Sequence, residues 1–314
     1  MRWLVQTKRS VAADGVVRGA RGRRQHLRGI ALCAIGVVVI SPDALIVRSV
    51  DANAWTTVAW RGIFTALGTM ALVLVLRPGV APDGRRLTGP HLFAGTLFAA
   101  ASVAFVSALD RTDAASVLVI IAAGPLIASV LGRVFLHQRA AARTWLTGVV
   151  VVAGLAVILG GSVGQGDVDG DLLALAGATC FAGYLTVSRA ARPADMTPAI
   201  GIGGIGAALA GLLAGADPWI SGRDLLLLAL LGIVILPVSL TLITRATHHV
   251  AAPEVNLVAL LETLLGPLWI WLAVGERPSA EVFAGGLLVV GAVTIHSALA
   301  LRAERDDTPA GVIV

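Results

Sequence analysis

The feature that constrains this chain most is a succession of ten apolar runs, each close to the length of a membrane-spanning helix. A helix needs about 20 mostly apolar residues to cross the hydrocarbon core, and in lipid its backbone polar groups must pair internally. Runs such as 31–40 also lack the alternating polarity of a β-barrel strand. The pattern predicts an all-α membrane protein with ten transmembrane helices. We place these at Leu27–Val47, Ala54–Leu76, His91–Leu109, Ala114–Leu136, Thr144–Ser162, Leu172–Val187, Pro198–Gly215, Leu225–Thr244, Ala252–Val274 and Val282–Leu301.

The composition agrees with this prediction and excludes several classes of protein. Of the 314 residues, 57% are apolar and 14% are charged, which excludes a soluble enzyme and a disordered chain. Cys33 and Cys180 lie within apolar runs, so a disulfide scaffold is excluded too. The basic residues lie in short segments between the runs, so we expect the lipid bilayer and a small-molecule substrate as partners, and no nucleic acid. No metal-ligand spacing is present, and we expect no metal and no cofactor.

The distribution of basic residues predicts the orientation in the membrane. Of the 24 lysines and arginines, nineteen lie in segments on one side, four on the other, and Arg61 lies inside a run. Because basic residues collect on the cytoplasmic side, we expect a multi-pass protein of the inner (plasma) membrane with both termini cytoplasmic. Residues 1–26 are predicted to be a disordered, basic cytoplasmic tail, and residues 304–314 a second tail.

The two halves of the chain resemble each other. Ala114–Gly161 aligns without gaps on Ala252–Leu299 at an offset of 138, which places Gly148 on Gly286. Each half holds five runs, an odd number, so the second half must cross the membrane in the opposite direction. We therefore predict two inverted five-helix repeats, at residues 27–162 and 170–303, an arrangement that recurs among transporters.

Four short motifs show similarity to a known family. They are Val58-Ala59-Trp60-Arg61-Gly62, Gly124-Pro125-Leu126, the run from Leu261-Glu262-Thr263 to Trp269, and Gly275-Glu276-Arg277. In combination they resemble the EamA-type transporters of the drug/metabolite transporter (DMT) superfamily, over about residues 28–303. The family usually has Gly-Glu after both the fourth and ninth spans, whereas this chain has His137-Gln138 after the fourth, and its usual Glu-Pro is Glu262-Thr263 here. The resemblance implies a secondary carrier, often an exporter, of amino acids, metabolites or drugs.

Two ionisable residues lie inside the first two spans. Asp43 and Arg61 are expected at similar depth, since each lies a few residues from the same end of its span. A charge within a span is costly and usually faces a partner or a cavity. The two residues form either a structural ion pair or part of a substrate pathway or gate, and Pro42 loosens the helix beside them.

Glu262 is expected near the centre of the ninth span, apart from other charges. Gly266 and Trp269 follow at helical spacing on the same face. A carboxylate at this depth stays neutral until water, substrate or a cation reaches it. Glu262 is either a proton-coupling residue of the pathway or a protonated side chain bonded to a neighbouring carbonyl.

The remaining candidates are polar or aromatic residues in the later spans. Glu254, Asn256 and His296 form either an inner gate or an interfacial cluster. Tyr184 and Trp269 either line the cavity or pack in the core. The segment Gly201–Gly206 matches a G-x-G-x-x-G pattern, but it has no strand before it and is predicted to be a helix-packing surface.

These observations predict a secondary active transporter, not an enzyme. We expect it to export a small organic metabolite, amino acid or drug by alternating access, driven by protons or exchange. Two other classes stay open: an integral-membrane enzyme acting on lipids, and a non-transporting membrane scaffold. Assembly as a homodimer also stays open.

Overall fold

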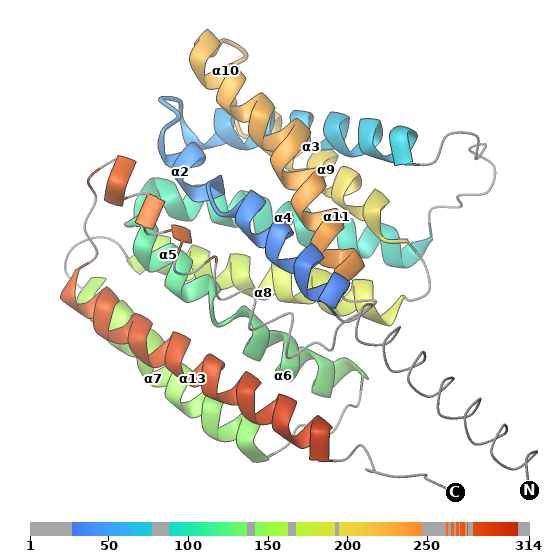
Figure 1. The fold of residues 1–314 in the computed structure, drawn as a ribbon. Helices are drawn as coiled ribbons and strands as arrows, with labels where there is room; N and C mark the ends of the chain where they lie inside the picture. The colour runs from blue at the N-terminus through green and yellow to red at the C-terminus, as the bar shows by residue number, and fades with distance from the viewer. Residues whose placement is uncertain are drawn as a thin grey trace, which may run out of the picture.

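The computed structural model describes residues 27–76, 88–136, 142–162, 168–191, 195–246, 262, 265–266, 268–269, 271–273, 275 and 279–306. Within these residues the fold is built of helices and contains no strand (Figure 1). In chain order the helices are 27–40, α2 (Asp43–Arg48), α3 (Ala54–Leu76), α4 (Gly89–Arg111), α5 (Ala114–Ile121), α6 (Gly124–Leu136), α7 (Ala142–Ser162), α8 (Val168–Ala190), α9 (Thr197–Leu213), α10 (Gly222–Ala229), the π-helical segment η2 (Leu230–Ile235), α11 (Leu236–Ala246) and α13 (Ala280–Asp306).

Several of these helices are long and apolar enough to cross a membrane. Five described helices meet that description, at Leu27–Arg48, Ala54–Val75, Gly89–Arg111, Val168–Ser188 and Gly222–Ala246. Shorter apolar helices include Thr197–Leu213 and Ala280–Ala292. Large apolar side chains such as Leu74, Leu146 and Phe283 are exposed on the outside of the bundle, as expected where lipid is the solvent. The chain is a multi-pass membrane protein.

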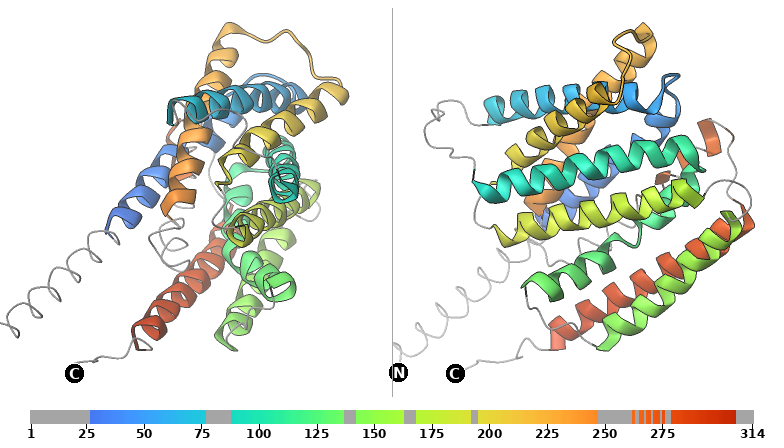
Figure 2. Two further views of the ribbon diagram at one scale, coloured as in Figure 1. Left: turned by 90° about the vertical axis from the view of Figure 1, so that its right-hand side faces the viewer. Right: turned by 180° about the vertical axis from the view of Figure 1, so that it is seen from behind.

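Equivalent helices of the two halves pack against each other in opposite directions. In α3 and α9, Gly62 faces Gly204 and Ala208, while Ala59, nearer the start of α3, faces Gly211, nearer the end of α9. In the same way α7 packs along α13 at the edge of the bundle (Figures 1 and 2). Opposed packing of equivalent helices is the arrangement that two inverted repeats produce.

Glycines permit the close approach of α3 and α9. A Cβ added at Gly62 would lie 2.5 Å from the backbone nitrogen of Ala208, and one at Gly204 would lie 2.8 Å from the carbonyl oxygen of Gly62. Gly203 and Gly206 meet α4 in the same close manner, at Phe98 and Ala99. The prediction that Gly201–Gly206 is a helix-packing surface is confirmed.

Two predicted spans are interrupted where proline removes a backbone donor, and a third has a proline just after a π-helical segment. Pro125 cannot bond the carbonyl of Ile121, and the run predicted at Ala114–Leu136 is divided there into α5 and α6. Pro42 likewise leaves the carbonyl of Val38 without its helical donor, and the hydroxyl of Ser41 donates to that carbonyl instead, at 2.8 Å. Pro237 follows the π-helical segment η2 in the eighth run. Helix interruptions of this kind are where transporters place binding groups.

Two names for the ends of the bundle are useful below. The Arg48 end is where α2 and α4 finish and α3 and α8 begin, and the Ala190 end is where α8 finishes and α9 begins. At the Arg48 end the backbone N–H of Asp217 donates to the Thr56 hydroxyl at 2.8 Å, and Thr112 donates to the Asp171 carboxylate at 3.1 Å. At the Ala190 end, His91 of α4 contacts the carbonyl of Asp195 at 3.2 Å. These contacts join the loops of the two halves.

Candidate functional site

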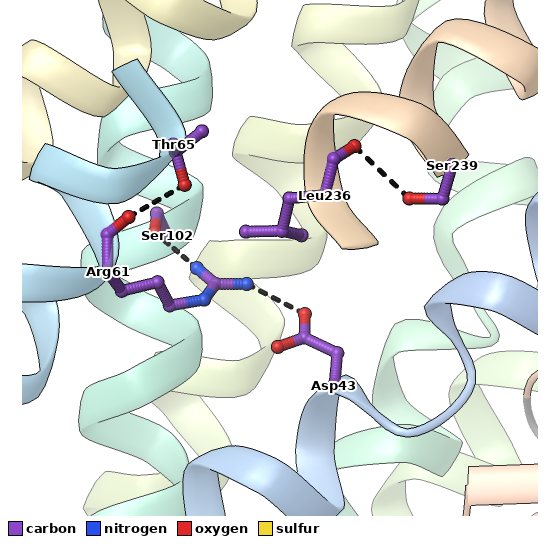
Figure 3. A network of polar contacts seen from close by, with 6 residues as sticks. All are labelled: Asp43, Arg61, Thr65, Ser102, Leu236 and Ser239. Carbon is purple, nitrogen blue, oxygen red and sulfur yellow. Dashed lines mark hydrogen bonds and ion pairs between the residues drawn. The ribbon is translucent and has the colours of Figure 1, made fainter. Parts of the chain in front are cut away.

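The break in the first span places a carboxylate opposite an arginine inside the bundle. Asp43 is the first residue of α2, and Arg61 projects from α3. Nη2 of Arg61 lies 2.7 Å from Oδ2 of Asp43 (Figure 3). The two residues are 4% and 7% exposed, so the pair is removed from solvent. The ion pair that the sequence analysis gave as one alternative is present.

The guanidinium of Arg61 is held from a second helix as well. Nη1 donates to the hydroxyl of Ser102 on α4 (Figure 3). The ring of Phe105, one turn further along α4, lies 5.5 Å from the guanidinium carbon, a cation–π contact. Arg61 therefore ties α2, α3 and α4 together through one planar group, which fixes its orientation.

The second repeat reaches this region through Trp269. Its indole Nε1 donates to Oγ of Ser41 at 3.1 Å, directly beside the break that precedes Asp43. Trp269 is 40% exposed, so its ring is only partly covered by the described residues. On the same helical segment, Gly266 lies against Leu118 of α5, where an added Cβ would approach Cδ1 to 2.6 Å. Trp269 and Gly266 of the ninth span thus lie against the first and fourth spans, respectively.

Glu262 belongs to the second repeat and lies in a helical part of the ninth span, two turns before Trp269. Its side chain is partly buried. A role for Glu262 in proton coupling stays a prediction.

A small pocket lies between the ion pair and the Arg48 end of the bundle. It holds about 70 Å³ and is lined by Val47, Arg48, Val50, Ala52, Ala54, Thr57, Val106, Leu109 and Asp110. Val47, Thr57 and Val106 each lie one helical turn from Asp43, Arg61 and Ser102, respectively. The pocket therefore lies at the Arg48 end of the bundle, one helical turn from the ion pair along the same three helices.

Tyr184 lies apart from the ion pair, toward the Ala190 end of α8. It is 1% exposed, and its ring packs against Phe98 and Phe181 at centroid distances of 5.4 Å and 5.7 Å. The aromatic cluster accounts for its burial by packing. A direct role for Tyr184 in a pathway stays a prediction.

The predicted inner gate cannot be built from the described residues. Glu254 and Asn256 lie outside them, and of His296 only the helical backbone in α13 is described. No group of three or more metal-ligating side chains comes together within the described part of the chain. The sequence analysis missed Ser41, Ser102 and Phe105, because a serine or phenylalanine inside an apolar run carries no signal by itself.

Comparisons with known proteins agree with this architecture. A model of the EamA-like transporter family matches residues 27–160 and, a second time, residues 168–298. The chain belongs to this family. The two matches correspond to two EamA repeats, and members of the EamA-like family are membrane transporters.

The fold also occurs among solved structures. One, described only as "Crystal structure of protein", has a TM-score of 0.64 and 20% sequence identity, over 88% of this chain and 99% of that one. At this identity the likeness supports the fold alone. A search of curated protein sequences gives no significant match.

Proposed function

We propose that this protein is a secondary active transporter of the inner membrane that exports a small organic molecule by alternating access. Both termini would be cytoplasmic, which makes the Arg48 end of the bundle the outer end. The observation that carries the proposal is the buried Asp43–Arg61 ion pair, beside which Trp269 of the second repeat donates to Ser41, because polar side chains of both repeats meet there within the membrane. Carriers built of inverted repeats place their binding and coupling groups at such a repeat interface.

The charges inside the spans support coupling to protons. Arg61 offsets Asp43, so the ion pair is neutral, whereas Glu262 would carry an uncompensated negative charge when it is ionised. An uncompensated charge inside the membrane is costly, and a single proton removes it. Glu262 is the carboxylate without a described cationic partner, and we assign the exchangeable proton to it. Substrate or water reaching Glu262 from either side would change the occupancy of that proton.

The test compares Glu262→Gln with a matched carboxylate in proteoliposomes. The substitution keeps the size and hydrogen bonding of the side chain but cannot release a proton. The control is Glu281→Gln, because Glu281 is exposed at the start of α13, where hydrogen bonds from the backbone and from Ser279 hold the pKa of its carboxyl below the usual range. Flux would be measured with a panel of amino acids and small aromatic amides and amines, with and without a pH gradient.

We expect Glu262→Gln to lose flux driven by the pH gradient and to keep part of the exchange at equal pH. Glu281→Gln should behave as the wild type does. Unchanged pH-driven flux in Glu262→Gln would show that the proton is carried elsewhere or that protons do not drive transport. Absence of solute flux in the wild type would favour the two other classes, a lipid-modifying enzyme or a scaffold.

A further inference from the structure

The Asp43–Arg61 ion pair uses only part of its hydrogen-bonding capacity. The carboxylate bonds Arg61 through Oδ2, and the guanidinium uses Nη1 and Nη2. Oδ1 of Asp43 and Nε of Arg61 are buried and have no hydrogen-bond partner among the described residues. One strong acceptor and one strong donor are therefore left over on a single buried pair.

In the view of Figure 3, Oδ1 of Asp43 and Nε of Arg61 lie on the same side of the contact between Nη2 and Oδ2. Arginine pairs side-on with a carboxylate through Nε and Nη together, which would use both atoms. Here Ser102 and Phe105 hold the guanidinium from α4, and the second contact is not made. An acceptor and a donor remain beside each other.

Leaving such atoms unpaired inside a protein is unfavourable, so a group that satisfies both would be bound strongly there. The group must offer an N–H to Oδ1 and an acceptor oxygen to Nε–H, side by side. A planar amide or lactam edge has this pattern. The pocket at the Arg48 end lies one turn away, at Val47, Thr57 and Val106.

We propose that the substrate carries a neutral amide or lactam edge that binds Oδ1 of Asp43 with its N–H and accepts from Nε–H of Arg61 with its carbonyl oxygen. This inference rests on the proposed transport function and names the chemical class of its substrate. An amide fits better than a charged group because the ion pair it binds is itself neutral. A second ammonium or carboxylate would bring an uncompensated charge into this buried place. The partly covered ring of Trp269 adds an aromatic surface from the second repeat for a planar ligand.

Three probes of one shape separate the candidate chemistries. Benzamide, benzylamine and benzoate share the same ring and differ in whether the head group is a neutral amide, an ammonium or a carboxylate. Their dissociation constants for the purified full-length protein in detergent can be compared by ligand-observed NMR at pH 7. We expect benzamide to bind about tenfold more tightly than either charged probe, since it alone pairs both left-over atoms.

Two variants test whether the ion pair makes the distinction. Arg61→Lys keeps the positive charge but has no atom equivalent to Nε, and it should abolish the preference for benzamide. Glu281→Gln, at the exposed start of α13, should leave the preference unchanged. If Arg61→Lys does not fold, the ranking of the three probes on the wild type still decides the question.

Each other ranking overturns the inference. Tighter binding of benzylamine would indicate a cation site formed by the carboxylates, and tighter binding of benzoate would indicate that Arg61 is free to bind anions. Equal binding, or binding of none of the three, would indicate that water or closure of the ion pair satisfies the two atoms. The transport proposal is tested separately. Proton flux that depends on Glu262, without benzamide binding, refutes only the proposed substrate class. Benzamide binding without any solute flux refutes only the proposal that the protein is a carrier.

Discussion

Removal of the Arg61 guanidinium should destabilise the protein, and its cost should not add fully to the cost of removing the Asp43 charge. Arg61→Met keeps a long apolar side chain but deletes the contact with Asp43, the hydrogen bond to Ser102 and the cation–π contact with Phe105. It also leaves the Asp43 carboxylate, which is 7% exposed, without a cation. Breaking a buried pair from one side costs about 3–5 kcal/mol of unfolding free energy. We expect Arg61→Met to lie in that range.

The second single substitution should cost less. Asp43→Asn removes the negative charge but leaves Arg61 bonded to Ser102 and stacked near Phe105, so we expect a loss of about 1.5–3 kcal/mol. In the double variant the Asp43 carboxylate, which Arg61→Met alone leaves without a cation, is absent. Its total loss should fall short of the sum of the two single losses by about 2 kcal/mol, the range of coupling seen between residues in contact.

The measurement is a double-mutant cycle on the free energy of unfolding, from reversible denaturation in mixed micelles. Arg223→Met is a matched control, because its side chain is 68% exposed and lies 3.6 Å from Asp224, and exposed pairs contribute only about 0–1 kcal/mol. Strictly additive losses at Asp43 and Arg61 would refute the view that the two groups compensate each other.

Three further predictions follow from the packing and the charge distribution. Gly62→Ala should lower the free energy of unfolding by about 3 kcal/mol or more, since its Cβ would lie 2.5 Å from the Ala208 backbone. Gly148→Ala, where an added Cβ has nothing within 4 Å, should leave stability unchanged. Equal effects of the two substitutions would contradict the close α3–α9 contact. Trp269→Phe keeps an aromatic ring but removes the hydrogen-bond donor to Ser41. It should slow transport several-fold, measured as flux per folded molecule in proteoliposomes, without loss of folded protein. An unchanged rate would show that this hydrogen bond does not contribute to transport. In a background without Cys33 and Cys180, Arg85→Cys should react with a membrane-impermeant thiol reagent only after the cells are permeabilised. Asp51→Cys should react with the same reagent in intact cells. The reverse pattern would show that the topology is the opposite of the one proposed.

The sequence predicts most of the architecture because apolar length and charge distribution act locally. The prediction of a span such as Ala54–Leu76 needs no tertiary information, and the observed helix α3 has the same bounds as this predicted span. Prolines were visible too, but the sequence does not indicate whether a span bends or divides. At Pro42 the outcome depends on Ser41, whose hydroxyl takes over the bond to Val38.

The candidate site is less accessible to prediction because its contacts span distant parts of the chain. The pairing of Asp43 with Arg61 could be anticipated, since two opposite charges at similar depth in lipid have few other partners. The contact between Trp269 and Ser41 joins the ninth span to a break in the first, and neither residue carries a charge that would signal it.

The two repeats place different chemistry at equivalent positions. An offset of 141 aligns Gly29 with Gly170 and Arg48 with Arg189, and the same offset places Asp43 on Tyr184. Both residues are buried, but Asp43 lies toward the Arg48 end and is held by a guanidinium, whereas Tyr184 lies toward the Ala190 end among Phe98 and Phe181. A contact between charges responds to a proton on a neighbouring carboxylate, while a cluster of aromatic rings does not. Inversion of the repeats therefore places equivalent positions toward opposite ends of the bundle, with an ion pair toward the Arg48 end where the Ala190 end has an aromatic cluster.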